Sequence, residues 1–351
     1  MSEGISKPFA KGSDIESYNS VYGYFLTQCR HNKLKVAFTT SSDITGPGQC
    51  KSFWLFEKSR WIKVRKTGYA GVIFDKFSPT KMKMKTLRNL LFSSPTIIPF
   101  NHPYLFDLFF DKLKAYKELS SFSIPTVTIA TSTRKSIEQA CKTLSEITIK
   151  HPHNNDFSDE IVMKDRFGAG GEQVYKFKNR QQKNMQAVMK KNNNISYIIQ
   201  PLVAFDKGFK INNSFVSADI RLIYSGGKVI QTYVRMAQAH DFRCNAHAGG
   251  SIKYFSNNEL PRKVTLYARK IFTALGKNAS LYSLDFIMSN NGNIYLLEGN
   301  TGPGLNWSLT NREDKIGAQK LIRIIVKQLK KLAYPTPKLP ETEDEFTIPY
   351  S

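Results

Sequence analysis

A short β-hairpin that carries two carboxylates and an amide constrains this chain more than any other feature. Two mainly apolar runs, residues 282–288 and 294–298, are joined around Asn-Asn-Gly-Asn, which favours a tight turn. Adjacent strands of such a hairpin place Asp285 beside Glu298, and side-chain alternation places Asn300 on the face of Glu298. Oxygen ligands that converge in this way suit Mg²⁺ or Mn²⁺. The alternative is a hairpin whose polar face is simply solvated.

A glycine-rich loop behind a lysine is the second feature. A short apolar strand ends near Lys164, and the loop that follows contains Gly168, Gly170 and Gly171. A lysine in this place can contact phosphate as a point charge, while the glycines let backbone N–H groups close over it. The loop is neither a P-loop nor a dinucleotide-binding loop, because no Gly-Lys-Ser/Thr and no helix follow it. A tight hairpin without a ligand is the other interpretation.

Charged side chains on expected strands form the third feature. Arg221 and Arg235 lie in two runs that meet at Gly-Gly, and an inward-facing guanidinium there needs an anionic partner. Phosphate or carboxylate would provide it, whereas each arginine alone could form a surface salt bridge. His247, in the polar loop that follows, could be a general base, a metal ligand or a hydrogen-bonded structural residue. The same loop contains Arg243, Asn245, Gly249 and Gly250.

Taken in this order, the three features resemble the ATP-grasp superfamily, and specifically the RimK-type carboxylate–amine ligases, over about residues 110–307. Residues 110–126 resemble the opening motif of the family, which implies that Lys112 is the first ATP-binding lysine. Lys164 and the glycine loop resemble the second lysine and the phosphate-covering loop. Residues 199–203 resemble the hinge that holds adenine, which implies contacts from Gln200, Pro201, Leu202 and Val203.

The resemblance also implies roles for the polar residues nearer the C-terminus. Arg235, Arg221 and Asn245 would be catalytic, and Arg243, Asn245, Gly249 and Gly250 would line the substrate end of the cleft. Asp285, Glu298 and Asn300 match the metal-binding end and imply ATP with two Mg²⁺ or Mn²⁺ ions. Asp165, Glu172 and Gly299 depart from the pattern, but none of them removes an expected ligand.

An α/β (α+β) fold follows from the resemblance, with two α+β lobes that sandwich ATP behind a smaller α/β domain. The first hundred residues are only loosely similar to the N-terminal part of YheC/YheD-like proteins. Local patterns predict a strand over residues 34–40 and one helix over residues 106–121. We place the N-terminal pre-ATP-grasp domain at 1–104, the lobe with the phosphate loop at 105–198, the lobe with the metal site at 199–335, and an acidic Pro-rich tail at 336–351.

Composition bears on partners and compartment. The chain has 51 basic and 28 acidic residues, a formal net charge of +23, which attracts polyanions unless it only reflects a biased genome. An acidic small molecule or acidic peptide is therefore the expected substrate, whereas nucleic acid lacks a recognisable binding module here. The 4 cysteines have no metal-ligand spacing, no apolar run is long enough to span a bilayer, and no signal peptide is expected. These features predict a cytoplasmic protein.

The expected activity is ATP-dependent ligation of a carboxylate to an amine through an acyl phosphate. The acid would be an acidic small molecule or peptide, and the amine an amino acid or another amine. Two alternatives remain at this level. One is an ATP-grasp kinase that phosphorylates a polyanionic alcohol, and the other is an inactive ATP-binding protein of an assembly. The sequence leaves the oligomeric state open.

Overall fold

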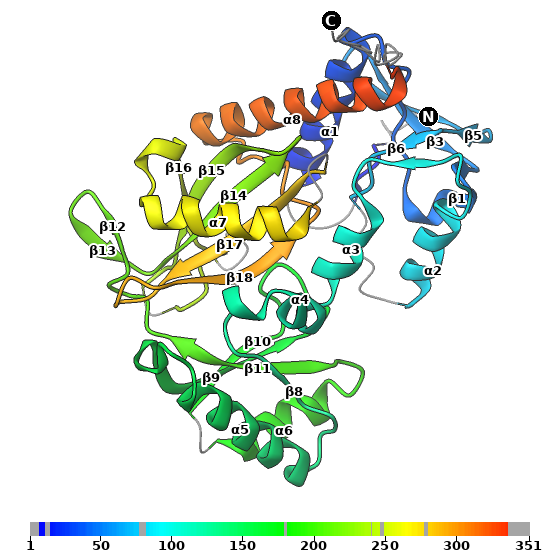
Figure 1. Cartoon of the computed structure of the whole chain (residues 1–351). Helices are drawn as coiled ribbons and strands as arrows, with labels where there is room; N and C mark the ends of the chain where they lie inside the picture. The colour runs from blue at the N-terminus through cyan, green and yellow to red at the C-terminus, as the bar shows by residue number, and fades with distance from the viewer. Residues whose placement is uncertain are drawn as a thin grey trace, which may run out of the picture.

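Two β-sheets, each covered by helices, lie one above the other, and the N-terminal segment packs beside the upper one (Figure 1). The computed structural model describes residues 7–10, 15–76, 82–178, 181–239, 241–245, 249–276 and 280–335. His247 and the expected acidic tail at 336–351 lie outside the described residues.

The lower sheet carries the glycine-rich loop between two of its strands. Its strand order is β10-β9-β11-β8, and every pairing in it is antiparallel. Apolar side chains of one face, among them Met163 and Ile199, pack against two helices. Figure 1 shows these helices beneath the sheet. The elements are β8 (Val127–Thr128), β9 (Phe157–Asp165), β10 (Val174–Lys178), β11 (Tyr197–Val203), α5 (Arg134–Ile149) and α6 (Gln182–Lys191).

The upper sheet is antiparallel throughout, with the order β16-β15-β14-β17-β18. Two of its hairpins are those expected from the sequence, around residues 226–227 and 290–293. One face is covered by α7, which lies across the strands in Figure 1, and by α3. The elements are β14 (Ala218–Ser225), β15 (Lys228–Met236), β16 (Ser251–Phe255), β17 (Tyr282–Met288), β18 (Ile294–Asn300), α3 (Pro103–Phe110) and α7 (Arg262–Leu275).

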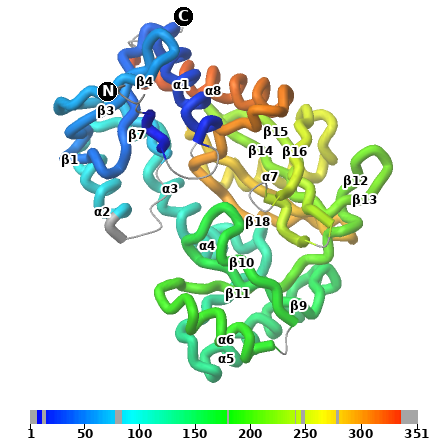
Figure 2. The backbone as a smooth tube through the Cα atoms, turned by 180° about the vertical axis from the view of Figure 1, so that it is seen from behind, coloured from blue at the N-terminus to red at the C-terminus, as the bar shows by residue number. Residues whose placement is uncertain are grey.

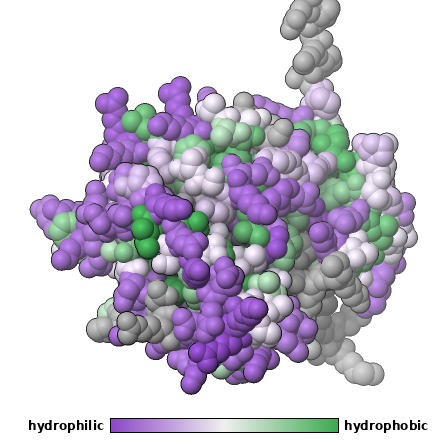
Figure 3. Space-filling view, turned by 60° about the horizontal axis from the view of Figure 1, so that its bottom comes forward, coloured by the Kyte–Doolittle hydropathy of each residue, from purple (hydrophilic) through white to green (hydrophobic). Residues whose placement is uncertain are grey.

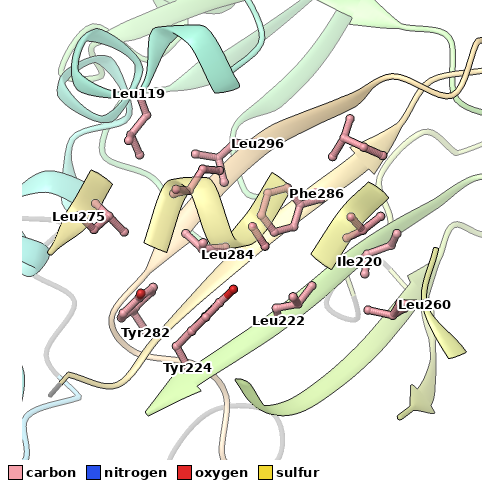
Figure 4. Packing of buried hydrophobic residues seen from close by; sticks show 14 of the residues in the cluster. Leu119, Ile220, Leu222, Tyr224, Leu260, Leu275, Tyr282, Leu284, Phe286 and Leu296 are labelled. Atoms are coloured by element: carbon pink, nitrogen blue, oxygen red, sulfur yellow. The ribbon is translucent and has the colours of Figure 1, made fainter. Parts of the chain in front are cut away.

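Alternation along the central strands separates an apolar face from a charged one. On β14, Ile220 and Leu222 point toward α7, and Figure 4 shows them in one layer with Phe286 of β17. In the same layer the rings of Tyr224 and Tyr282 stack at a centroid distance of 5.1 Å. Each large side chain buried in this way contributes roughly 1.5–3 kcal/mol. This packing determines which residues of these strands point to the opposite, charged face of the sheet.

The N-terminal segment and the last helix cover part of the charged face. Helices α1 (Ile15–His31) and α8 (Arg312–Ala333) lie side by side in Figures 1 and 2, and their apolar faces share a core with Ile223 of β14. The hydroxyl of Ser17 on α1 donates to the carbonyl of Trp307 at 2.6 Å. These contacts fix the N-terminal segment to the upper sheet, beside its charged face.

Two local predictions were wrong. The expected strand at 34–40 forms only an isolated bridge between Phe38 and Trp54. The expected helix at 106–121 is two helices, because Asp111 interrupts it and its carboxylate accepts from the backbone of Leu113 at 3.0 Å, which begins α4 (Lys112–Glu118). The remaining elements are β1 (Ile44–Gly46), β2 (Gln49–Cys50), β3 (Phe53–Glu57), β4 (Arg60–Val64), β5 (Gly68–Tyr69), β6 (Val72–Ile73), α2 (Met82–Leu91), β7 (Ile98–Pro99), β12 (Phe209–Ile211) and β13 (Ser214–Val216).

The face of the molecule shown in Figure 3 is mainly hydrophilic. On the face shown in Figure 3, apolar side chains form small areas separated by hydrophilic ones. None of the helices within the described ranges is both long and apolar enough to cross a membrane.

Candidate functional site

A single row of side chains crosses all five strands of the upper sheet. Glu298 of β18 is directly opposite Asp285 of β17, and Asp285 is opposite Arg221 of β14. Arg221 is in turn opposite Tyr233 of β15, which is opposite Tyr254 of β16. Directly paired residues in a sheet share one face. The row therefore places two carboxylates, a guanidinium and two phenols side by side on the charged face.

Asp285 is the centre of a buried charge network. Arg221 holds it with two hydrogen bonds, of which the one from Nε to Oδ1 is 2.6 Å long. Arg235 donates from Nη2 to Asp285 Oδ2 at 2.7 Å and also holds Asp219, with Nε at 2.6 Å from Oδ1. The side chains of Arg221, Arg235 and Asp285 are at most 8% exposed. Each charge in this network is thus offset by at least one opposite charge at hydrogen-bond distance.

Burial and charge act in opposite directions on these carboxyl groups. Burial alone would raise the pKa of Asp285, but Arg221 and Arg235 outweigh it and lower that pKa to about 2. Burial raises the pKa of Asp219 to about 6, although Arg235 opposes the shift. Both groups are therefore mainly ionised at neutral pH.

The other two hairpin residues are less constrained than Asp285. The side chain of Glu298 is 34% exposed, and Arg221 Nη2 is 3.8 Å from Glu298 Oε1. Asn300 Oδ1 accepts from the backbone N–H of Gly302 at 2.7 Å. The predicted pairing of Asp285 with Glu298 is confirmed. Asn300 is opposite Ser283, which is two residues before Asp285 on β17, so Asn300 lies on the face of the sheet that carries Asp285 and Glu298.

The donor chemistry of the hairpin fits a hard divalent cation. All three side chains offer oxygen atoms, and Mg²⁺ is commonly held by one or two carboxylates together with substrate phosphates. Asp285 is already bound by two arginines, so Glu298 is the carboxylate with the most open coordination. No cluster of three or more Asp, Glu, His or Cys side chains suited to a metal occurs within the described ranges. A metal here would therefore need oxygen atoms from a bound phosphate as well.

A cavity of about 2270 Å³ lies over this face, between the two lobes and the N-terminal segment. Lys164 on β9, which is 6% exposed, and Lys112 at the start of α4 enter it from the lower lobe. Burial lowers the pKa of Lys164 to about 8, and repulsion from Lys112 adds to the shift. Burial also lowers the pKa of Lys112, whereas Glu298 opposes that change. Two ammonium groups and the least constrained carboxylate of the hairpin thus act on one another across the cavity.

The turn between β9 and β10 closes over the lysines. Lys112 Nζ donates to the carbonyl of Gly168, and the backbone N–H of Lys112 donates to the carbonyl oxygen of Arg166 at 3.1 Å. Gly170 and Gly171 have positive φ angles of 69° and 76°, which side-chain-bearing residues rarely adopt. The predicted strand–glycine loop–strand arrangement is confirmed by the antiparallel pairing of the two strands.

Comparison with known proteins identifies the family. A profile of the RimK-like ATP-grasp domain matches residues 110–325, which is well over half of the chain. The chain belongs to the RimK-like ATP-grasp family. Enzymes of the ATP-grasp family generally use ATP with Mg²⁺ or Mn²⁺, in agreement with the oxygen-rich hairpin described above.

Individual relatives resemble either one segment or most of this RimK-like chain. A probable α-L-glutamate ligase 2 of Pseudoalteromonas atlantica is 36% identical over 113 residues, or 32% of this chain and 35% of that protein. Among solved structures, D-alanyl-alanine synthetase A of Vibrio cholerae has a TM-score of 0.56 at 13% identity, over 91% of this chain and 96% of its own. A RimK domain ATP-grasp protein of Sphaerobacter thermophilus also reaches 0.56, at 10% identity, over 92% and 97% of the two chains.

These relatives support the assignment at two different levels. The curated glutamate ligase aligns over about a third of its own length, so it bears on one segment of this RimK-like chain and not on the whole protein. The two solved structures are only 10–13% identical to this chain, so they support the ATP-grasp fold and nothing beyond the fold.

All nine residues expected at the nucleotide end of a RimK-like site line the cavity. Gln200 is buried in β11, and its Nε2 donates to the hydroxyl of Thr126 at 2.7 Å. The structure therefore brings the hinge, the loop and both lysines to one cavity. The lining residues expected from the sequence are Lys112, Lys164, Gly168, Gly170, Gly171, Gln200, Pro201, Leu202 and Val203.

The residues expected at the substrate end of this RimK-like site are more dispersed. Asn245 lies against the glycine loop, where its Nδ2 donates to the carbonyl of Gly170 at 2.7 Å. Arg243 is 38% exposed and paired with Asp241 at 2.9 Å. An added Cβ on Gly250 would lie 2.2 Å from the carbonyl oxygen of Cys244, so this glycine allows close backbone packing. Gly249, with φ +87°, makes the turn into β16, but it does not line the cavity as Arg221, Arg235, Arg243, Asn245 and Gly250 do.

Sequence reasoning missed Lys76, which enters the cavity from the N-terminal segment. Its Nζ donates to the carbonyl of Gly302 at 2.7 Å and to that of Pro303. Burial lowers the pKa of Lys76 to about 7, and repulsion from Arg221 adds to the shift. The signal in the sequence was Asp75-Lys76 after a short apolar run, which by itself indicates only the end of a strand.

The charge of the cavity differs from the charge of the chain. The net charge of +23 led us to expect attraction of polyanions, but in the cavity lining acidic residues balance the basic ones. The basic excess therefore lies outside the cavity. The lining contains the cations Lys76, Lys112, Lys164, Arg221, Arg235 and Arg243, and the acids Glu16, Asp75, Asp165, Glu172, Asp219, Glu298 and Asp314.

Proposed function

We propose that this protein uses ATP to join a carboxylate to an amine and releases ADP and phosphate. The observation that carries this proposal is the row Glu298–Asp285–Arg221 beneath a cavity into which Lys112 and Lys164 also project. The arrangement offers separate places for phosphate groups, for a hard cation and for an anionic substrate. Membership of the RimK-like family, together with the similarity of one segment to probable α-L-glutamate ligases, supports the same reaction class.

In the first step, an oxygen of the substrate carboxylate attacks the γ-phosphorus of ATP. The bond from that phosphorus to the bridging oxygen breaks, and ADP leaves with the electron pair, so the products are an acyl phosphate and ADP. Lys112 and Lys164 place two ammonium groups at the phosphate end, where preorganised charge lowers the barrier. The glycine loop covers this end and limits access of water.

In the second step, the amine nitrogen attacks the acyl carbon and inorganic phosphate leaves. The amine loses one proton as the amide forms, and the departing phosphate takes it up. Asp285 fixes the guanidinium of Arg221, and Asp219 and Asp285 fix that of Arg235, which supports a role for both at the reacting groups. We assign both arginines to the stabilisation of charge on the transferring group.

Glu298 and Asn300 would hold the divalent cation from the cavity lining, with Asp285 buried beside Glu298. When bound, such a cation neutralises charge on the phosphates and fixes their orientation. Glu298 is the ligand with the most open coordination, because Asp285 already accepts hydrogen bonds from two arginines.

Glutamate is the first substrate to test, because a segment of this chain resembles probable α-L-glutamate ligases. The assay measures ADP formation with Mg²⁺ and ATP, with an acid alone, an amine alone, and both together. Mass spectrometry of the products identifies the new amide. A requirement for both substrates supports a ligase, whereas ADP formation that needs only an alcohol contradicts it and indicates a kinase.

A further inference from the structure

Lys76 reaches the site from outside the two lobes. It follows β6 in the N-terminal segment, and its ammonium donates to two successive carbonyls, those of Gly302 and Pro303. These carbonyls come two and three residues after Asn300, the last oxygen donor of the hairpin. The N-terminal segment therefore supplies a cation to the same cavity that holds the charged row.

The ammonium of Lys76 has no carboxylate at ion-pair distance within the described ranges, although Asp75 attracts it at longer range. Its sequence neighbour Asp75 accepts instead from Arg88, whose Nε is 2.9 Å from Oδ2. That pair is itself buried, with side chains 8% and 7% exposed. Two carbonyls satisfy two of the three N–H donors of Lys76 and none of its charge. A partly buried cation without a counter-ion is costly, and an anionic ligand would offset that cost.

Two pairs of cations enter the cavity from different parts of the fold. Lys112 and Lys164 repel one another and are both attracted to Glu298 from the lower lobe. Lys76 and Arg221 repel one another on the side of the N-terminal segment, and Arg221 is also attracted to Glu298. The first pair is covered by the glycine loop, as expected for a phosphate site. The second pair is close to Tyr233, whose hydroxyl accepts from Arg221 at 3.4 Å.

We infer that Lys76 is a binding residue for the carboxylate of the acid substrate and holds it together with Arg221, apart from the phosphates that Lys112 and Lys164 contact. The inference rests on the proposed ligase function. The third N–H of Lys76 donates to the carboxylate, while its two bonds to the 302–303 carbonyls fix the direction of the ammonium. This site makes the N-terminal segment part of the recognition of the acid.

A nucleotide phosphate is the other oxyanion that Lys76 could bind. Chemical labelling distinguishes binding of the substrate carboxylate from binding of the nucleotide phosphate. The full-length protein is treated with acetic anhydride, with and without Mg·ADP, L-glutamate and a short oligoglutamate, and acetylation of each lysine is measured by mass spectrometry. A carboxylate bound at Lys76 should slow its acetylation at least about fivefold in the presence of Mg·ADP. Mg·ADP alone should protect Lys112 and Lys164 and leave Lys76 reactive.

Three variants complete the experiment. Lys76→Met removes the charge, Lys76→Arg keeps it, and Lys66→Met changes an exposed lysine of the same segment. We expect Lys76→Met to weaken binding of L-glutamate to the Mg·ADP-bound protein about tenfold or more, measured by calorimetry. Binding of Mg·ADP itself should change less than about twofold. Lys76→Arg should recover part of the affinity, and Lys66→Met should match the wild type.

Several results would overturn the inference. These are protection of Lys76 by Mg·ADP alone, no protection by either carboxylate, or equal losses of glutamate and nucleotide affinity in Lys76→Met. The labelling uses the wild type, so it decides the question even if Lys76→Met fails to fold. A protein that protects Lys76 with a carboxylate but forms no amide would contradict the ligase proposal and leave the carboxylate site intact.

Discussion

Arg221 is directly opposite Asp285 where β14 pairs with β17, and its Nε lies 2.6 Å from Asp285 Oδ1. The two residues are 64 positions apart in the sequence. Their pairing aligns the row that crosses the sheet, since Glu298 is next to Asp285 and Tyr233 is next to Arg221. The charged face of the upper sheet is thus a consequence of strand register.

Replacement of Asp285 should damage stability as well as activity. Asp285→Asn leaves Arg221 and Arg235 buried without their shared carboxylate, and loss of one partner of a buried charge pair costs ~3–5 kcal/mol. Urea denaturation at pH 7 measures the loss. Because the pKa of Asp285 is lowered to about 2 in the folded protein, its contribution is present above the unfolded pKa of about 3.9. The difference between variant and wild type should therefore shrink as pH falls from about 4 toward 2. A variant as stable as the wild type at pH 7 would contradict the network.

Replacement of Glu298, in contrast, should reduce activity strongly and leave stability almost unchanged. Glu298→Gln keeps the shape of a side chain that is 34% exposed and 3.8 Å from its nearest cation, so stability should change by less than about 1 kcal/mol. ADP formation should fall by ~10²-fold or more, because a preorganised charge is lost from the site. Excess EDTA should abolish the activity of the wild type. Full activity of the variant, or activity in EDTA, would refute the metal assignment.

Nucleotide affinity should depend on pH through Lys164. Its pKa is lowered to about 8, so its positive charge is present below that pH and lost above it. Because phosphate binds the charged form, affinity for Mg·ADP should fall as pH rises from 7.5 to 9.5. Lys164→Arg keeps its charge over this range and should give a flatter profile. The matched control is Lys178→Arg, an exposed lysine of the adjacent strand, which should retain the slope of the wild type. Identical slopes of Mg·ADP affinity against pH in the wild type and both variants would show that Lys164 is not the source of the pH dependence.

Salt should have little effect on capture of the acid substrate. The basic and acidic residues of the cavity lining are nearly balanced, so long-range attraction into the cavity is weak despite the net charge of +23. We expect kcat/KM for the acid to change by less than about threefold between 20 and 300 mM salt. A steep decline would show that the outer basic surface guides the substrate. Nucleic acid binding that resists salt would point to a different partner.

Local sequence patterns predicted the parts of the site that are close in the chain. The 282–300 hairpin was predictable because alternation and the turn residues fix its register, and both put Asp285 beside Glu298. The glycine turn between β9 and β10 was predictable for the same reason. The family resemblance added the order of the elements, which periodicity alone does not provide.

Long-range relationships were not predictable in this way. Nothing local indicates that Arg221 pairs with Asp285 or that Arg235 also reaches the same carboxylate, because both depend on how distant strands pair. Lys76 was missed because its partners are the carbonyls of a loop more than 220 positions away. The break at Asp111 was missed because an N-cap inside an apolar run looks like one polar residue of a single helix.

Amine-dependent ADP formation tests the central claim most directly. The wild type and Glu298→Gln are incubated with ATP, Mg²⁺, and a panel of acids and amines that includes L-glutamate and oligoglutamate, and products are identified by mass spectrometry. The account predicts that the wild type forms one ADP per new amide, only when both an acid and an amine are present, and that the variant forms neither product. ADP formation without an amide, or dependent on an alcohol alone, would contradict it.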